Sequence, residues 1–255
     1  SNARLSKLIF DKNPDRGFYV EESFPHDWMY PHLMPNGLIM KINREPLPEL
    51  PDDVIQKDLD YWQRRVDGWL GKWLTPETSV ETVADFAMKT FGRKDLSGFT
   101  GDPAFVSDAY APKMFSKWRS FSAGAYAWRL GAGPVESLPE YLAKSDAEKQ
   151  KLSQAADFAF MQAFAICPYS PEVVFRYVNF LMKADRHADA LAIVHAAAII
   201  DPKNNSLRSL EHNLSAQAKA SAIEAQPGEQ FKMSEVSKKV EIIRQKKEEL
   251  EAQQK

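Results

Sequence analysis

The chain has one cysteine, Cys167, among its 255 residues. A single cysteine cannot form a disulfide within the chain, so a disulfide-stabilised scaffold is excluded. No apolar run approaches the roughly 20 residues that a helix needs to cross a bilayer. The formal net charge is only −2, which argues against a dedicated nucleic-acid-binding protein, because such proteins carry a basic field. Hydrophobic residues make up 44% of the chain, which is enough for an ordinary buried core.

Catalytic motifs are also missing. Residues 98–103 read GFTGDP, but no Lys-Ser or Lys-Thr follows, so they are not a phosphate-binding loop. No serine stands in a nucleophile elbow, and no motif pairs Cys167 with a histidine, which favours a buried core thiol. We therefore predict no catalytic residue, no cofactor and no metal site in this chain. Whether it belongs to an enzyme stays open.

One short segment concentrates side chains that could bind a metal or transfer protons: Glu21, Glu22, His26, Asp27 and His32. Zinc-binding histidines on a helix usually stand four positions apart, and these two do not. We expect a polar turn in which the histidines hydrogen-bond locally. The alternative is that the segment contacts another domain that handles a sugar or a lipid.

A repeat of 34 residues organises the stretch from 152 to 202. Shifting the sequence by this period aligns small, large, small, apolar and proline positions: Ala156 with Ala190, Phe160 with Val194, Ala163 with Ala197, Ile166 with Ile200, and Pro168 with Pro202. This period and spacing are typical of tetratricopeptide repeats, in which small residues let paired helices approach closely. Residues 131–145 interrupt the pattern, so one repeat is complete and one is split.

We predict a mainly α fold: a tetratricopeptide-like array of helical hairpins, or α-solenoid, with a small N-terminal α/β piece. Residues 4–50 form that piece, with a helix near 4–12, strands near 17–23 and 38–43, and a short helix from Asp27. Residues 51–226 form an irregular helical domain whose first helix begins after Pro51. Residues 227–255 form a C-terminal helix with apolar residues at heptad spacing.

Three tryptophans, Trp62, Trp69 and Trp73, share one face of the helix that follows Pro51. Their helical spacing is what core packing produces. A platform on which carbohydrate rings stack would show the same spacing. We favour the core interpretation, and burial of all three side chains would exclude the platform.

Four blocks carry a resemblance to a known family. They are residues 18–25 (FYVEESFP), 28–33 (WMYPHL), 37–44 (GLIMKINR) and 167–179 (CPYSPEVVFRYVN). Together they resemble the soluble C-terminal tail of bacterial multi-spanning membrane proteins related to protein O-mannosyltransferases. The resemblance implies that glycosyl transfer occurs in a membrane part outside this chain, and that the tail lies on the extracytoplasmic, periplasmic side. No catalytic residue of that family maps onto this sequence.

Two functional hypotheses follow. In the first, the chain is a non-catalytic interaction or scaffold module that binds a protein or peptide. Stacked helical pairs form a concave surface lined by the first helix of each pair, and we expect the contacts on that inner face, at Arg176, Asn179 and Lys183. In the second, it is a regulatory or substrate-contacting part of a membrane-embedded glycosyltransferase, and its contacts with the membrane domain lie at Phe24, His26, Asp27, Trp28 and Tyr30. Neither hypothesis involves nucleic acid, and the oligomeric state stays open.

Overall fold

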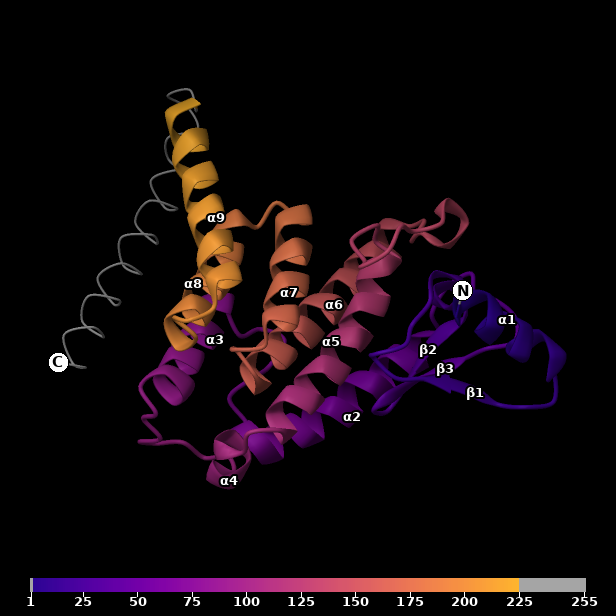
Figure 1. Ribbon diagram of the computed structural model, residues 1–255, viewed down its shortest axis with the longest axis horizontal. Helices are drawn as coiled ribbons and strands as arrows, with labels where there is room; N and C mark the ends of the chain where they lie inside the picture. The colour runs from indigo at the N-terminus through magenta and orange to yellow at the C-terminus, as the bar shows by residue number, and fades with distance from the viewer. Residues whose placement is uncertain (1, 225–255) are drawn as a thin grey trace.

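The computed structural model describes residues 2–224, which form a mainly helical molecule with one small antiparallel sheet (Figure 1). Figure 1 shows the sheet and helix α1 (Asn2–Lys12) at one end of the molecule, α2 (Asp52–Leu70), α5 (Ala111–Trp128) and α6 (Asp146–Ile166) in the middle, and α8 (His187–Ile200) and α9 (Asn205–Glu224) at the other end. The mainly α class with a small N-terminal piece that contains strands is confirmed. The C-terminal helix predicted over 227–255 lies outside the described residues.

The N-terminal piece consists of α1 (Asn2–Lys12), β1 (Phe18–Val20), the 3-10 helix η1 (Asp27–His32), β2 (Leu33–Asn36) and β3 (Ile39–Ile42). The helix, the two strands and the short helix from Asp27 that the sequence predicts are confirmed. Strand β2 was not predicted, because Pro35 lies within it. The sheet order is β1-β3-β2, which places β2 at an edge, where a proline is tolerated.

This sheet does not form its core alone. The buried side chains of the whole N-terminal piece (Phe10, Val20, Met29, Tyr30, Leu33, Met40 and Ile42) cluster with three buried residues of a long helix, Phe121, Ala125 and Trp128. The ring of Tyr30 lies 5.7 Å from that of Trp128. A sheet this small buries too little apolar surface to be stable by itself. The shared cluster therefore fastens it to the helices.

The remaining chain is helical, and most of its helices begin where the sequence predicts. The helices are α2 (Asp52–Leu70), α3 (Val80–Ala87), which continues into the π-helical turn η2 (Met88–Gly92), α4 (Pro103–Ser107), α5 (Ala111–Trp128), the 3-10 turn η3 (Pro139–Tyr141), α6 (Asp146–Ile166), α7 (Pro171–Lys183), α8 (His187–Ile200) and α9 (Asn205–Glu224). Ser145 caps α6 as predicted, because its hydroxyl accepts a hydrogen bond of 3.1 Å from the backbone N–H of Glu148.

The repeat positions lie where the helices meet. Helices α5 and α6 pack against each other, as do α7 and α8, and α3 and α9 both pack on α8. Four small repeat residues, Ala156, Ala163, Ala190 and Ala197, have no exposed surface. Because an alanine adds only a methyl group, two helices that meet at such positions can approach closely. These contacts make a helical array from hairpins.

A charged pair lies in the middle of this core. Nη1 of Arg119 on α5 donates to Oδ2 of Asp58 on α2 over 2.7 Å, and both side chains are essentially inaccessible to solvent. The hydroxyl of Tyr126 donates to the same carboxylate oxygen at 2.7 Å. Nε of Arg119 donates to Gln162 of α6 at 2.8 Å, and the guanidinium lies over the ring of Trp62. This network joins α2, α5 and α6.

Candidate functional site

The predicted contact residues lie on one face of α7. Positions 172, 176, 179 and 183 are three or four residues apart and so lie on the same side of a helix. Asn179 and Lys183 are exposed. Phe175, one turn before Asn179, is 40% exposed and adds an apolar group beside it. We call the surface formed by Phe175, Asn179 and Lys183 the α7 face.

Arg176 has a different environment. Its guanidinium forms an ion pair with Glu172 and donates to the hydroxyl of Ser120 on α5 over 3.1 Å. Its side chain is 22% exposed. In this structure Arg176 braces α7 against α5, and whether it also contacts a partner stays a prediction.

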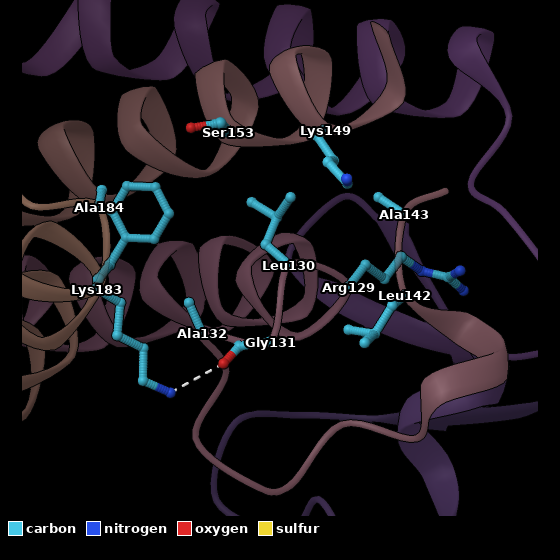
Figure 2. Close-up of a pocket in the computed structure, with 11 residues that line it drawn as sticks. Arg129, Leu130, Gly131, Ala132, Leu142, Ala143, Lys149, Ser153, Lys183 and Ala184 are labelled. Carbon is cyan, nitrogen blue, oxygen red and sulfur yellow. Dashed lines mark hydrogen bonds between the residues drawn. The ribbon is translucent and has the colours of Figure 1, made fainter. Parts of the chain in front are cut away.

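Lys183 links the α7 face to a pocket. Its ammonium donates to the carbonyl of Gly131, just after α5, over 2.9 Å (Figure 2). Beyond this bond lies a pocket of about 520 Å³ at the meeting point of the end of α5, the segment after it, the start of α6 and the end of α7. It is lined by Arg129, Leu130, Gly131, Ala132, Leu142, Ala143, Lys149, Ser153, Phe180, Lys183 and Ala184. We call it the α5–α7 pocket.

The local sequence explains how this pocket forms. Helix α5 ends at Trp128, and Gly131 adopts a φ of 73°, which turns the chain away from the helix axis. The N–H of Ala143 then donates to the carbonyl of Arg129 over 2.8 Å. This bond returns residues 142 and 143 to the end of α5 just before α6 begins. The segment 131–145, which interrupts the repeat, therefore forms one wall of the pocket.

Arg129 is the most buried cation of this pocket. It is 1% exposed, and its Nη1 and Nη2 donate to the carbonyls of Pro48 (3.2 Å) and Leu47 (3.0 Å). Burial lowers its pKa to about 10, and the charges of Glu148, Tyr141 and Glu49 offset only part of this effect. Arg129 forms no ion pair with a carboxylate of the described residues. A buried guanidinium whose hydrogen-bond partners are neutral carbonyls contributes a positive charge that the nearby Glu148 and Glu49 offset only in part.

The predicted contact residues near the N-terminus do not form one exposed patch. Phe24 is 69% exposed, Asp27 is exposed and His26 is half-buried. Trp28, also half-buried, packs on the ring of Phe10 at 5.2 Å. Tyr30 is 4% exposed and belongs to the core shared with α5. An apolar surface that combines Phe24, Trp28 and Tyr30 is therefore not present, because the sheet needs the last two rings for its own packing.

The acidic and histidine side chains of 21–32 do not converge either. Nδ1 of His32 lies 2.8 Å from the carbonyl of Asn43, a local hydrogen bond of the kind the sequence predicts. Glu22 instead contacts Glu172 of α7, and burial together with this carboxylate raises the pKa of Glu22. Lys117 and Arg176 oppose that rise. Among residues 2–224, no three His, Cys, Asp or Glu side chains come together in a way that could hold a metal ion.

Two other candidate features are structural. Trp62 is fully buried, Trp69 stacks on Phe105 at 4.5 Å, and Trp73 packs on Phe86 at 4.4 Å. Trp69 and Trp73 are half-buried, so burial of all three side chains, which would exclude a carbohydrate platform, is not met. Their rings nevertheless pack on Phe105 and Phe86, which favours the core interpretation. Cys167 is buried, and burial raises its pKa to about 11. A thiol with such a pKa is almost entirely protonated at neutral pH and is a poor nucleophile.

The sequence predicts Lys183 as a contact residue for a protein or peptide, but it gives no signal for Arg129 and Lys149 as residues of the α5–α7 pocket. Each stands at the end of a different helix, and no local pattern connects them.

No family model, curated protein or solved structure matches the chain. Within residues 2–224, no helix combines the length and the apolar character that a membrane span requires.

Proposed function

We propose that this chain is a non-catalytic scaffold that binds a protein or peptide, as the periplasmic part of a larger bacterial membrane protein of the glycosyltransferase type. The observation that supports it best is the α7 face, where Phe175 is 40% exposed beside the exposed Asn179 and Lys183. An exposed aromatic side chain with polar neighbours is a frequent anchor in protein interfaces.

The architecture supports the same proposal. Helices α7 and α8 pack against each other as a pair. The proposal takes α7 as the first helix of this pair, and in a tetratricopeptide-like array such first helices line a common inner surface. The ion pair of Arg176 with Glu172, and its bond to Ser120, hold α7 in place on α5. A preformed surface loses less conformational entropy on binding than a mobile one. The expected partner is an extended segment with an apolar residue for Phe175 and an acidic residue for Lys183.

A peptide selection tests this proposal. Peptides displayed on phage would be selected on the wild-type chain and their affinities measured by fluorescence polarisation. We expect the selected peptides to bind a Phe175→Ser, Asn179→Glu double variant at least about tenfold more weakly, because an anchor residue is lost. A Phe24→Ser variant, which removes an exposed aromatic ring elsewhere, should bind them as the wild type does. Equal binding to the double variant would exclude the α7 face.

A second function is favoured by the exposed apolar residues of the N-terminal piece. Phe24 is 69% exposed, and Leu5, Leu8 and Ile9 of α1 are 58%, 52% and 47% exposed. These side chains could contact a membrane-embedded catalytic domain, so the chain would regulate that domain or help to hold its substrate. Alanine substitutions at Phe24, His26 and Asp27 should then lower glycosyl transfer by the full-length protein. Unchanged activity of that variant would remove this second function.

A further inference from the structure

The charged residues that line the α5–α7 pocket are all basic. Its ionisable lining residues are Arg129, Lys149 and Lys183, and none of the residues that line it is an aspartate or glutamate. The three cations come from three places in the fold: the end of α5, the first turn of α6 and the last turn of α7. Figure 2 shows Lys149 and Lys183 on opposite sides of the space between the helices.

These cations keep unused capacity to bind an anion. Among the described residues 2–224, the neutral carbonyl of Gly131 is the only group to which Lys183 donates. Lys149 has an exposed partner, Asp146, at 3.7 Å, which is a weak surface contact. Arg129 is bonded only to carbonyl oxygens, and Figure 2 shows its guanidinium turned to the side of Leu142 and away from Lys183. Its charge therefore acts on the pocket through the low-dielectric interior rather than by direct contact.

The rest of the lining is mostly apolar. Leu130, Leu142 and Phe180 contribute the large side chains, and Ala132, Ala143 and Ala184 the small ones, while Ser153 adds one hydroxyl. In Figure 2 the side chain of Leu130 points toward the space below Lys149. A volume of about 520 Å³ falls within the range of roughly 300–1,000 Å³ that is usual for small-molecule sites. A bare inorganic anion would leave most of this apolar surface uncovered.

We propose that the α5–α7 pocket binds a small organic anion that has one carboxylate or phosphate head and an apolar body. Lys149 and Lys183 contact the head, and Arg129 adds favourable electrostatic potential from behind. Leu130 and Phe180 cover the body. This binding does not depend on peptide binding, because Lys183 is the only residue that the pocket shares with the α7 face.

Isothermal titration calorimetry of the whole chain tests the proposal with four probes: octanoate, octyl phosphate, octanol and inorganic phosphate. We expect at least one of the two amphipathic anions to saturate a single site, and the tighter of the two identifies the preferred head. Octanol lacks the anionic head and inorganic phosphate lacks the apolar body, so each should bind at least about tenfold more weakly than the preferred anion. The absence of saturation by both anions up to about 10 mM, the weak end of measurable affinity, would overturn the proposal.

Variants locate the site. A Lys149→Gln, Lys183→Gln double variant should bind the preferred anion about tenfold more weakly, because two partly exposed charge contacts are lost. The matched control is Lys72→Gln with Lys203→Gln, which removes the same charge at two exposed lysines that do not line the pocket. The control should bind as the wild type does. Equal weakening by both double variants, or by neither, would overturn the assignment to this pocket. A Phe175→Ser variant should bind the anion as the wild type does. A failure of the peptide-binding proposal can therefore be told apart from a failure of the anion-binding proposal.

Discussion

Replacing Asp58 by asparagine tests the role of the buried charged pair. The substitution keeps the size of the side chain but removes its charge, and so leaves Arg119 buried without a carboxylate at 2.7 Å. Removing one partner of a buried ion pair typically costs about 3–5 kcal/mol. Asp58 also lines a surface pocket of about 510 Å³ with Tyr61 and Arg64, but its side chain is only 1% exposed. We therefore expect Asp58→Asn to lower the free energy of unfolding by about 3–5 kcal/mol.

Urea denaturation measures the loss. Far-UV circular dichroism reports on the helices, and tryptophan fluorescence reports on all six tryptophans together, one of which, Trp62, has its ring 5.4 Å from the Arg119 guanidinium. Asp58→Asn should lower the midpoint without changing the dependence on urea, because the exposed surface of the unfolded chain is the same. Asp60→Asn is the control: Asp60 lies on the same helix, is exposed and accepts a bond only from Gln56. Its effect should stay within about 0.5 kcal/mol.

A compensated variant separates charge from packing. Asp58→Leu together with Arg119→Met, Tyr126→Phe and Gln162→Leu replaces the pair and the two side chains bonded to it by apolar groups of similar size. Gln63 loses its bond from Gln162 but keeps its bonds to Asp67 and to the carbonyl of Leu74. Buried ion pairs replaced in this way often give equal or higher stability. We expect the compensated variant to be at least as stable as Asp58→Asn. A loss below about 1 kcal/mol for Asp58→Asn would refute the reasoning, since it would mean that Arg119 is not left as an unpaired buried charge.

Three further predictions concern other parts of the fold. The pKa of the Glu22 carboxyl in the folded protein is raised above its usual 4.5. The protonated carboxyl therefore stabilises the fold fully below pH 4.5, and this stabilisation is lost as pH rises through the raised pKa. Glu22→Gln should flatten the pH dependence of stability, measured as urea midpoints at several pH values. Gly101→Ala should cost about 1–3 kcal/mol or more, because its Cβ would lie 2.4 Å from the carbonyl of Trp69. Ala197→Leu should cost a similar 1–3 kcal/mol or so by overpacking a position with no exposed surface. Thermal melts of Ala197→Leu beside Ala216→Leu, at an exposed position of α9, check the last of these.

Much of the helical fold is predictable from the sequence because helix signals are local. Pro51 and Ser145 precede the helices that they were expected to start, and the repeat alanines are buried as their period implies. Strand β2 was missed because Pro35 reads as a breaker unless the strand is known to lie at an edge. Asp58 was missed for a similar reason: an aspartate within an apolar stripe is interpretable only when its partners are known, and Arg119 follows 61 residues later.

The α5–α7 pocket shows why its site residues could not be predicted in the same way. Residues 131–145 only interrupt the 34-residue repeat when they are read as sequence, and by that standard they carry no function. In the structure, the bond from Ala143 to the carbonyl of Arg129 returns this segment to the end of α5, where it forms a wall opposite α7. The same bond brings Lys149, six residues later, to the side of the space that faces Lys183. The departure from the repeat therefore builds the pocket, and a regular hairpin with a short turn would have no room for it.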